Sequence, residues 1–151
     1  MNTRSLHILL ADDDPDDRML LADALAEVRC TSTAQLHTVE DGQQLLEYLR
    51  RQGKFKQLTG GPPTLILLDL NMPRKDGREA LRELKSDERL RRIPVVVLTT
   101  SNAEEDIRRT YDLGVNSFII KPSSFQDLVG ILKVLSDYWF ETVKLPNGDK
   151  G

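Results

Sequence analysis

Polar residues that could carry out chemistry stand at the ends of short apolar runs in this sequence. An acidic pair ends the first run, a single aspartate ends another, and hydroxyl and ammonium groups end the two runs that follow. In chain order these residues are Asp12 and Asp13, Asp69, Thr99 with Thr100, and Lys121. Carboxylates packed together raise one another's pKa unless a cation neutralises them. The pattern therefore predicts a hard divalent cation with oxygen ligands, Mg²⁺ above all and Mn²⁺ as an alternative.

A carboxylate beside such a cation could act as a nucleophile toward phosphorus. Asp69 would then form an aspartyl phosphate, an established use of carboxylates. Charge that develops on the phosphoryl oxygens would be met by the ammonium of Lys121 and the hydroxyl of Thr99. Taken singly, these side chains have ordinary alternatives as a strand-end acid, a surface lysine and a strand threonine. Their occurrence at successive strand ends favours a common site.

The elements that must position these residues form a repeating pattern. Short apolar runs, which suit strands buried on both faces of a parallel sheet, alternate with amphipathic stretches. Strands are expected at residues 6–11, 34–39, 64–69, 94–100 and 115–120. Helices are expected to start at Asp14-Pro15 and Asp41-Gly42, to cover residues 76–87 and 103–113, and to run from Ser123/Ser124 to about Val143.

Alternation of this kind predicts an α/β protein with a doubly wound, five-stranded parallel sheet in three α/β/α layers. Right-handed crossovers leave few topologies, and the flavodoxin-like strand order 2-1-3-4-5 is expected. In such folds the site lies at the carboxyl ends of the strands, between the first and third strands.

Composition limits the class of protein further. The 151 residues fit a single domain spanning 1–151, with a core of about 5–137 and an extension of the last helix with a tail over about 138–151. A net charge of −3 gives no bulk affinity for nucleic acid. Neither a membrane span nor a signal peptide is recognised, and Cys30 is the lone cysteine, so a cytoplasmic location is expected. The segment 51–63 is long for a helix–strand connection.

Four motifs in order, ILLADDDPDD, LILLDLNMPRKDG, IPVVVLTTS and FIIKP, resemble the receiver domains of two-component response regulators, the CheY-like family. The resemblance implies that Asp69 is the phosphoacceptor and that Asp12, Asp13, Asp69 and a backbone carbonyl at Asn71 serve the metal. It makes Thr99 the switch hydroxyl, Lys121 the phosphate-binding lysine and Phe118 the switch aromatic. It also implies a cis bond before Pro122 and sets Thr100 where the family often has a smaller residue.

A narrower resemblance concerns the partners. The segments NMPRKDGREAL, LRRIPVVVLTTS and DYWFETVKLP look like those of small regulators that serve phytochrome histidine kinases. This implies a sensor histidine kinase as phosphodonor and an unidentified downstream protein as target. The cluster Tyr138, Trp139, Phe140 and Val143 exceeds what one helix face can bury, so a homodimer through the last helix is expected, the alternative being a tail folded back on its own sheet.

Two other functions occur on the same fold, and the sequence disfavours both. An aspartyl-phosphate phosphohydrolase acting on a small substrate generally needs a second acid two residues after its nucleophile, where this chain has Asn71. A flavin-binding electron carrier needs a phosphate-cradling loop after the first strand, where the run Asp-Asp-Asp-Pro-Asp-Asp would repel phosphate. The expected protein is therefore a signalling phosphoacceptor rather than an enzyme that turns over a substrate. Its only chemistry is self-phosphorylation from a phosphohistidine and slow autodephosphorylation.

Overall fold

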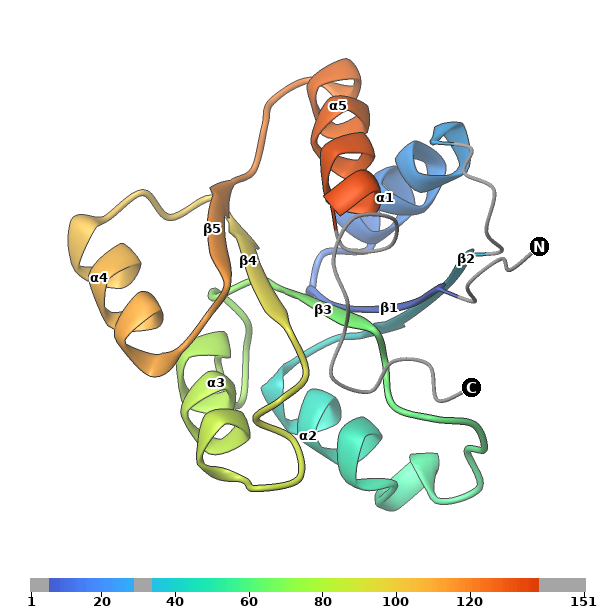
Figure 1. Cartoon of the computed structure of the whole chain (residues 1–151), viewed down its shortest axis with the longest axis vertical. Helices are drawn as coiled ribbons and strands as arrows, with labels where there is room; N and C mark the ends of the chain where they lie inside the picture. The colour runs from blue at the N-terminus through green and yellow to red at the C-terminus, as the bar shows by residue number, and fades with distance from the viewer. Residues whose placement is uncertain (1–5, 29–33, 139–151) are drawn as a thin grey trace.

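The computed structural model describes residues 6–28 and 34–138, which form one parallel sheet with helices on both faces (Figure 1). The sheet order is β2-β1-β3-β4-β5, and each neighbouring pair of strands is parallel. The strands are β1 (Leu6–Ala11), β2 (Ala34–Val39), β3 (Leu65–Leu68), β4 (Val95–Thr99) and β5 (Ser117–Ile120). The predicted fold class and strand order are confirmed.

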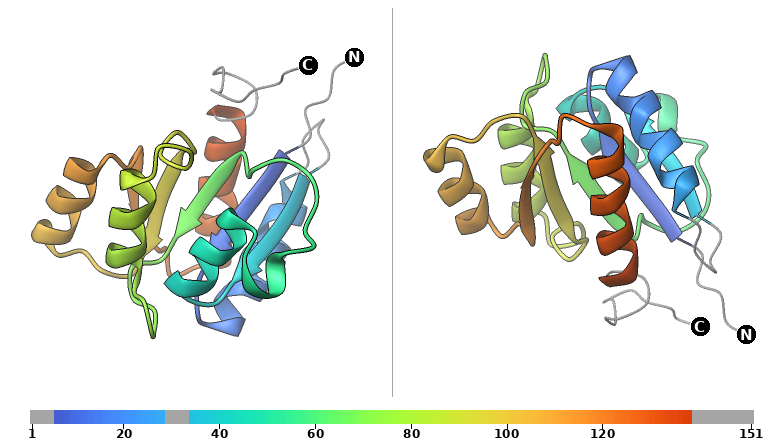
Figure 2. Two further views of the ribbon diagram at one scale, coloured as in Figure 1. Left: turned by 90° about the horizontal axis from the view of Figure 1, so that it is seen from below. Right: turned by 90° about the horizontal axis from the view of Figure 1, so that it is seen from above.

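Five α-helices among the described residues complete the three layers. They are α1 (Pro15–Glu27), α2 (Gly42–Arg50), α3 (Gly77–Ser86), α4 (Glu104–Leu113) and α5 (Phe125–Ser136). Helices α1 and α5 cover one face of the sheet, and α2, α3 and α4 cover the other (Figures 1 and 2). No helix in the described part of the chain has the length and apolar character needed to cross a membrane.

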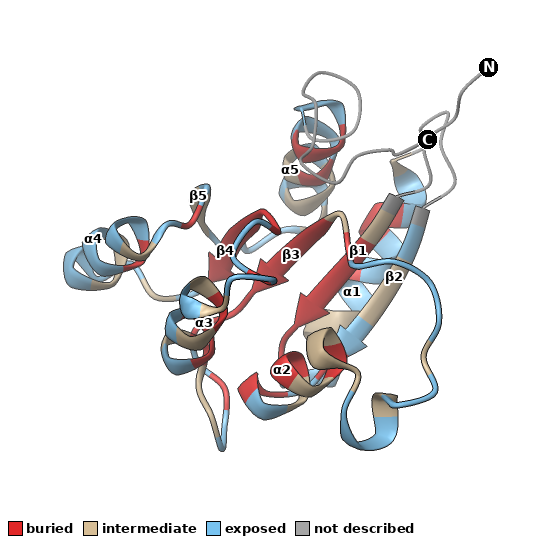
Figure 3. Cartoon of the chain, turned by 60° about the horizontal axis from the view of Figure 1, so that its bottom comes forward, coloured by how far each residue is buried: buried red, intermediate tan, exposed pale blue. Residues whose placement is uncertain are grey.

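The core lies in two apolar layers on either side of the central strands. All four residues of β3 and all five of β4 are buried, which explains their continuous apolar sequence (Figure 3). Leu9, Ile66 and Leu81 belong to the layer beneath α2 and α3, whereas Leu10, Leu67 and Leu132 belong to the layer beneath α1 and α5. This two-sided burial holds the carboxyl ends of the strands in a fixed arrangement.

Helix ends follow the local signals of the sequence. The side chains of Asp14, Asp41 and Ser124 accept hydrogen bonds from backbone N–H groups in the first turns of α1, α2 and α5. Helix α4 ends at Gly114, whose φ of 107° lies in the left-handed region that glycine adopts without strain.

The long segment 51–63 contains a single 3₁₀ turn, η1 (Gly53–Phe55). Arg51 holds the segment back on itself, because its Nη2 donates to the carbonyls of Gly60 and Gly61 at 3.0 and 3.1 Å. The proposed single-domain limits remain a prediction. The proposed dimer residues Trp139, Phe140 and Val143 lie outside the described residues, and Tyr138 is half exposed.

Candidate functional site

The residues proposed from the sequence gather at one edge of the sheet. Asp12 follows β1, Asp69 follows β3, Thr99 is the last residue of β4, and Lys121 follows β5. Because β1 and β3 are neighbours whose connections leave in opposite directions along the sheet, their carboxyl ends form the switch point of the fold.

Three carboxylates form the centre of this site. Oxygen atoms of Asp12, Asp13 and Asp69 all lie within 4.8 Å of one another. Asp12 and Asp69 are 2% and 6% exposed, whereas Asp13 faces solvent. Burial raises the pKa of the Asp12 carboxyl, against the lowering effect of its hydrogen bonds. An oxygen-only donor set with excess negative charge and one solvent-exposed member fits a hard divalent cation.

Lys121 is the cation that contacts the carboxylates of the site. Its Nζ lies 2.8 Å from Asp12, 2.7 Å from Asp17 and 3.2 Å from Asp69. Burial by itself would lower the pKa of the Lys121 ammonium, but the hydrogen bonds to Asp12 and Asp17 outweigh it and hold the pKa above its usual value. One ammonium therefore serves three carboxylates, and Asp13 adds a fourth nearby.

Asp17 is a member of this group that sequence reasoning missed. It lies in the first turn of α1, where an acidic side chain is already explained by the helix dipole. Only the packing of α1 beside α5, the helix that follows Lys121, shows that Asp17 also contacts Lys121. The single signal in the sequence was its place within the run Asp-Asp-Asp-Pro-Asp-Asp.

Asp69 is held by donors from two directions. The Thr99 hydroxyl donates to Asp69 Oδ1 at 2.7 Å, and the Asn71 backbone N–H donates to the same oxygen at 3.2 Å. Thr99 is fully buried, whereas Thr100 and the Asn71 side chain face solvent. The proposed nucleophile thus has fixed donors on its inner side and two polar residues at its outer edge.

Phe118 and Pro122 lie farther from the carboxylates. Phe118 is half buried against the core layer beneath α2 and α3, and its backbone N–H donates to the Tyr111 hydroxyl at 3.1 Å. The expectation of a cis bond before Pro122 is wrong, because the described chain contains no cis peptide bond. Trans is the intrinsically favoured isomer even before proline. The trans bond is compatible with the contacts that Lys121 makes to Asp12 and Asp69.

The loop after β3 is fixed by close backbone approach. The N–H of Gly77 donates to Leu70 O at 2.9 Å, which seats the start of α3 directly on the segment that carries Asp69. A Cβ on Gly77 would lie 2.3 Å from Asp69 O and 2.7 Å from Leu70 Cα. Only glycine permits this approach.

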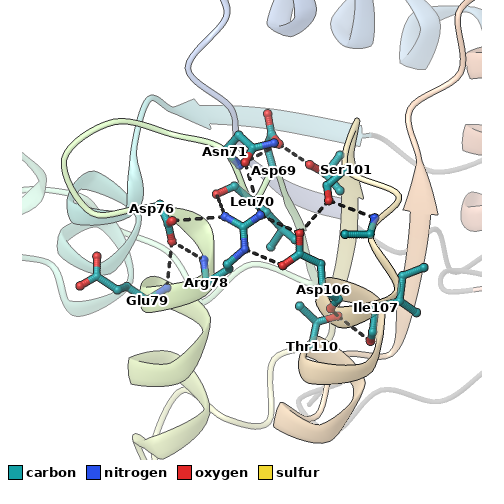
Figure 4. Close-up of polar contacts among 12 residues, drawn as sticks. Asp69, Leu70, Asn71, Asp76, Arg78, Glu79, Ser101, Asp106, Ile107 and Thr110 are labelled. Carbon is teal, nitrogen blue, oxygen red and sulfur yellow. Dashed lines mark hydrogen bonds and ion pairs between the residues drawn. The ribbon is translucent and has the colours of Figure 1, made fainter.

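Sequence reasoning also missed a group of contacts between α3 and α4. Arg78 in α3 binds the Asp106 carboxylate in α4, and Ser101 donates to the same carboxylate (Figure 4). Asp106 lies 28 residues from Arg78 in the chain. No periodic or local pattern connects the two, so nothing in the sequence alone would have paired them.

Comparison with known proteins shows the family of this chain. A family model of the response regulator receiver domain matches residues 8–133, which is most of the chain. The chain therefore belongs to the response regulator receiver family.

Three of the proteins to which this chain is similar are the following. The response regulator Rcp1 of Synechocystis is 42% identical over 92% of this chain and 92% of its own length, and the Mn²⁺-bound form of Rcp1 superposes with a TM-score of 0.83. The phosphorylated cyanobacterial phytochrome response regulator RcpA is 43% identical, with a TM-score of 0.86 over 96% of this chain and 99% of RcpA. A probable methanogenesis regulatory protein, FilR2 of Methanothrix harundinacea, is 43% identical over 87% of this chain and 82% of its own length.

Proposed function

We propose that Asp69 is the phosphoacceptor of a stand-alone response regulator that a phytochrome-type sensor histidine kinase phosphorylates. The observation that carries the proposal is the setting of Asp69, a buried carboxylate between the Thr99 hydroxyl and the Lys121 ammonium. Asp12 and Asp13 stand beside it. Nucleophile, charge-neutralising groups and a donor set for a cation are the three parts that phosphoryl transfer to a carboxylate requires.

Asp12, Asp13 and Asp69 would hold Mg²⁺, with the backbone carbonyl of Asn71 as a further ligand and Mn²⁺ as an alternative ion. When bound, the ion would neutralise charge on the phosphoryl oxygens. The Mn²⁺-bound form of Rcp1 supports a divalent ion in this family.

The residues of this chain would act in a simple order. An Asp69 oxygen forms a bond to phosphorus while the bond from phosphorus to the donor histidine nitrogen breaks, and the leaving imidazole keeps that electron pair. Lys121 and Thr99 are already within hydrogen-bond distance of the Asp69 carboxylate. Each would then donate to a phosphoryl oxygen, so charge that develops there meets donors that need little rearrangement.

Asn71 supports a switch rather than a phosphohydrolase. It occupies the position, two residues after Asp69, at which aspartyl-phosphate phosphohydrolases generally carry a second acid. An exposed amide cannot protonate a leaving group. An amide cannot act as a general base toward water either, so the phosphoryl group on Asp69 would be lost slowly.

The kinase assignment rests on RcpA, a phytochrome response regulator to which this chain is 43% identical. Phosphorylation would stabilise an active conformer that already exists in the population. The signal would pass to an unidentified downstream protein through the surface formed by α4, β5 and α5, on which Tyr111 and Ile120 are exposed.

A homodimer through Tyr138, Trp139, Phe140 and Val143 is a separate part of the proposal. Tyr138 lies two residues after α5 and is 50% exposed, as expected of an interface residue in an isolated chain. Truncation after Asp137 is expected to convert the dimer to a monomer in light scattering. An unchanged mass and stability after truncation would contradict it.

The decisive experiment is incubation with Mg²⁺ and acetyl phosphate, followed by intact-mass spectrometry. The mass should rise by one phosphoryl group, and neither Asp69→Asn nor the wild type in EDTA should gain it. Asp23→Asn, an exposed aspartate on α1, is the matched control and should label normally. Labelling of Asp69→Asn, or none of the wild type, would sink the proposal.

A further inference from the structure

An ion pair outside the carboxylate cluster joins the starts of helices α3 and α4. Nε and Nη2 of Arg78 donate to Oδ1 and Oδ2 of Asp106 at 2.8 and 2.7 Å (Figure 4). A two-pronged contact of this kind fixes relative orientation as well as distance. Because Arg78 follows the β3–α3 loop and Asp106 follows the β4–α4 loop, the pair ties together the two loops that border Asp69.

On the α3 side, the pair reaches Asp69 through Asn71. Nη2 of Arg78 also donates to Oδ1 of Asn71 at 3.4 Å, and the Asn71 backbone N–H donates to Asp69. Nη1 of Arg78 contacts Asp76, whose carboxylate also caps α3. The Arg78 guanidinium therefore contacts residues of the β3–α3 loop as well as Asp106 in α4.

On the α4 side, the pair reaches Asp69 through the β4–α4 loop. The Ser101 hydroxyl donates to Oδ2 of Asp106 at 2.7 Å. Thr99, two residues earlier, donates to Asp69. Together with the contacts on the α3 side, these hydrogen bonds connect the Arg78–Asp106 pair to Asp69 through both the β3–α3 loop and the β4–α4 loop.

The pair stays ionised across the working pH range. The hydrogen bonds from Arg78 are the largest cause that lowers the pKa of Asp106 to about 2, and they raise the pKa of Arg78. The Arg78 side chain is 34% exposed and the Asp106 side chain 17%, so solvent screens the contact only in part. By contrast, the pair between Arg109 and Glu105 on α4 is mostly exposed and joins no loops.

We propose that the Arg78–Asp106 pair is a positioning device that holds the β4–α4 loop closed beside Asp69, with the Thr99 hydroxyl turned inward before a phosphoryl group arrives. This inference rests on the proposed role of Asp69 as phosphoacceptor. A donor that is already aimed needs no reorganisation during the reaction. If only the closed conformer reacts, the rate follows its population. The pair should therefore raise the rate of phosphorylation and leave metal affinity nearly unchanged. Neither residue belongs to the carboxylate cluster, and Arg78 contacts the side chain of Asn71 rather than the backbone carbonyl proposed as a ligand.

The test compares Arg78→Ala, Asp106→Ala and the double variant with the wild type. Initial rates of Asp69 labelling by acetyl phosphate are measured at saturating Mg²⁺, and Mg²⁺ affinity is measured by calorimetry. Each single variant should label roughly 5-fold more slowly, equivalent to about 1 kcal/mol. The double variant should be no slower than the singles, because both remove the same contact. Metal affinity should stay within about 2-fold of wild type, since a conformational gate acts on rate.

Matched variants separate positioning from general stability. Arg109→Ala removes an arginine and its ion pair from α4, the helix that carries Asp106, and should label at the wild-type rate. Arg78→Lys keeps the charge but loses the two-pronged contact, so it should recover only part of the rate. Ser101→Ala, a milder change, breaks the link from the pair to the loop and should also slow labelling.

Three results would overturn the inference. These are wild-type rates in both single variants, effects that multiply in the double variant, or an equal loss in Arg109→Ala. Failure of the proposed function would give a different result, because the wild type itself would then not be labelled on Asp69.

Discussion

Replacing Lys121 with Met should destabilise the metal-free protein, and added Mg²⁺ should reduce the difference. The Lys121 side chain is 15% exposed, and its Nζ lies 2.8 Å from Asp12 and 3.2 Å from Asp69. Removal of one member of a buried ion pair costs about 3–5 kcal/mol, since the remaining charge keeps its desolvation penalty. Met fills similar space without a charge. Asp17, at 35% exposure, can turn to water, so a loss near the lower end, about 3 kcal/mol, is expected.

Metal binding should offset part of that loss. The proposed Mg²⁺ ion at Asp12, Asp13 and Asp69 would neutralise Asp12 and Asp69, the two buried carboxylates that Lys121 no longer contacts in the variant. Mg²⁺ at 100 times its Kd stabilises a folded protein by about 2.7 kcal/mol. The variant lacks a competing ammonium, so its Mg²⁺ affinity should rise and the gap to wild type should shrink by roughly 1 kcal/mol.

The assay is urea unfolding followed by far-ultraviolet circular dichroism, in EDTA and in saturating Mg²⁺. Lys133→Met, which removes an exposed lysine from α5, is the control and should change neither curve. A destabilisation of equal size in both buffers would refute the electrostatic reasoning, because it would show that the lost packing of the lysine stem is the cause. An unchanged stability in EDTA would refute it as well.

Three further predictions concern stability. Gly77→Ala should lower the free energy of unfolding in urea by about 1–3 kcal/mol, because the added Cβ would lie 2.3 Å from Asp69 O. Gly130→Ala, in open space on α5, should raise it by about 0.5–1 kcal/mol. Equal effects of the two substitutions would contradict this reasoning. Burial is the largest cause that lowers the pKa of His7, from 6.5 to about 4. The unfolded chain therefore binds a proton at a higher pH than the folded protein does, and the free energy of unfolding should fall as the pH drops from 6.5 toward 4. His7→Gln should flatten that slope, and an unchanged slope would count against the assignment. Asp41→Ala removes the side-chain cap of α2 and should lower the unfolding free energy by about 1 kcal/mol, which a wild-type urea midpoint would disprove.

The fold was readable from the sequence because its signals are local. Continuous apolar runs identified the buried strands, and Asp14, Asp41 and Gly114 identified helix ends within a residue or two. Parallel strands joined by right-handed crossovers then allow few orders. The observed order β2-β1-β3-β4-β5 is the one expected.

The grouping of the site residues was also predictable. Asp12, Asp69, Thr99 and Lys121 each end an apolar run, and the carboxyl ends of parallel strands share one edge of the sheet. Family motifs added roles to these positions but did not determine the peptide bond before Pro122, which is trans. The preference of an X–Pro bond is only about 0.5–1 kcal/mol, so surrounding contacts decide it.

What the sequence by itself determined is therefore the set of residues at the strand ends, since periodicity and chain direction place them there. Tertiary structure alone decided which side chains meet across elements. Asp17 reaches Lys121 only because α1 packs beside α5, the helix that follows Lys121, and Arg78 reaches Asp106 only because α3 and α4 lie side by side. Such contacts depend on the packing of helices against the sheet, to which residues distant in the chain contribute, and no local pattern records them.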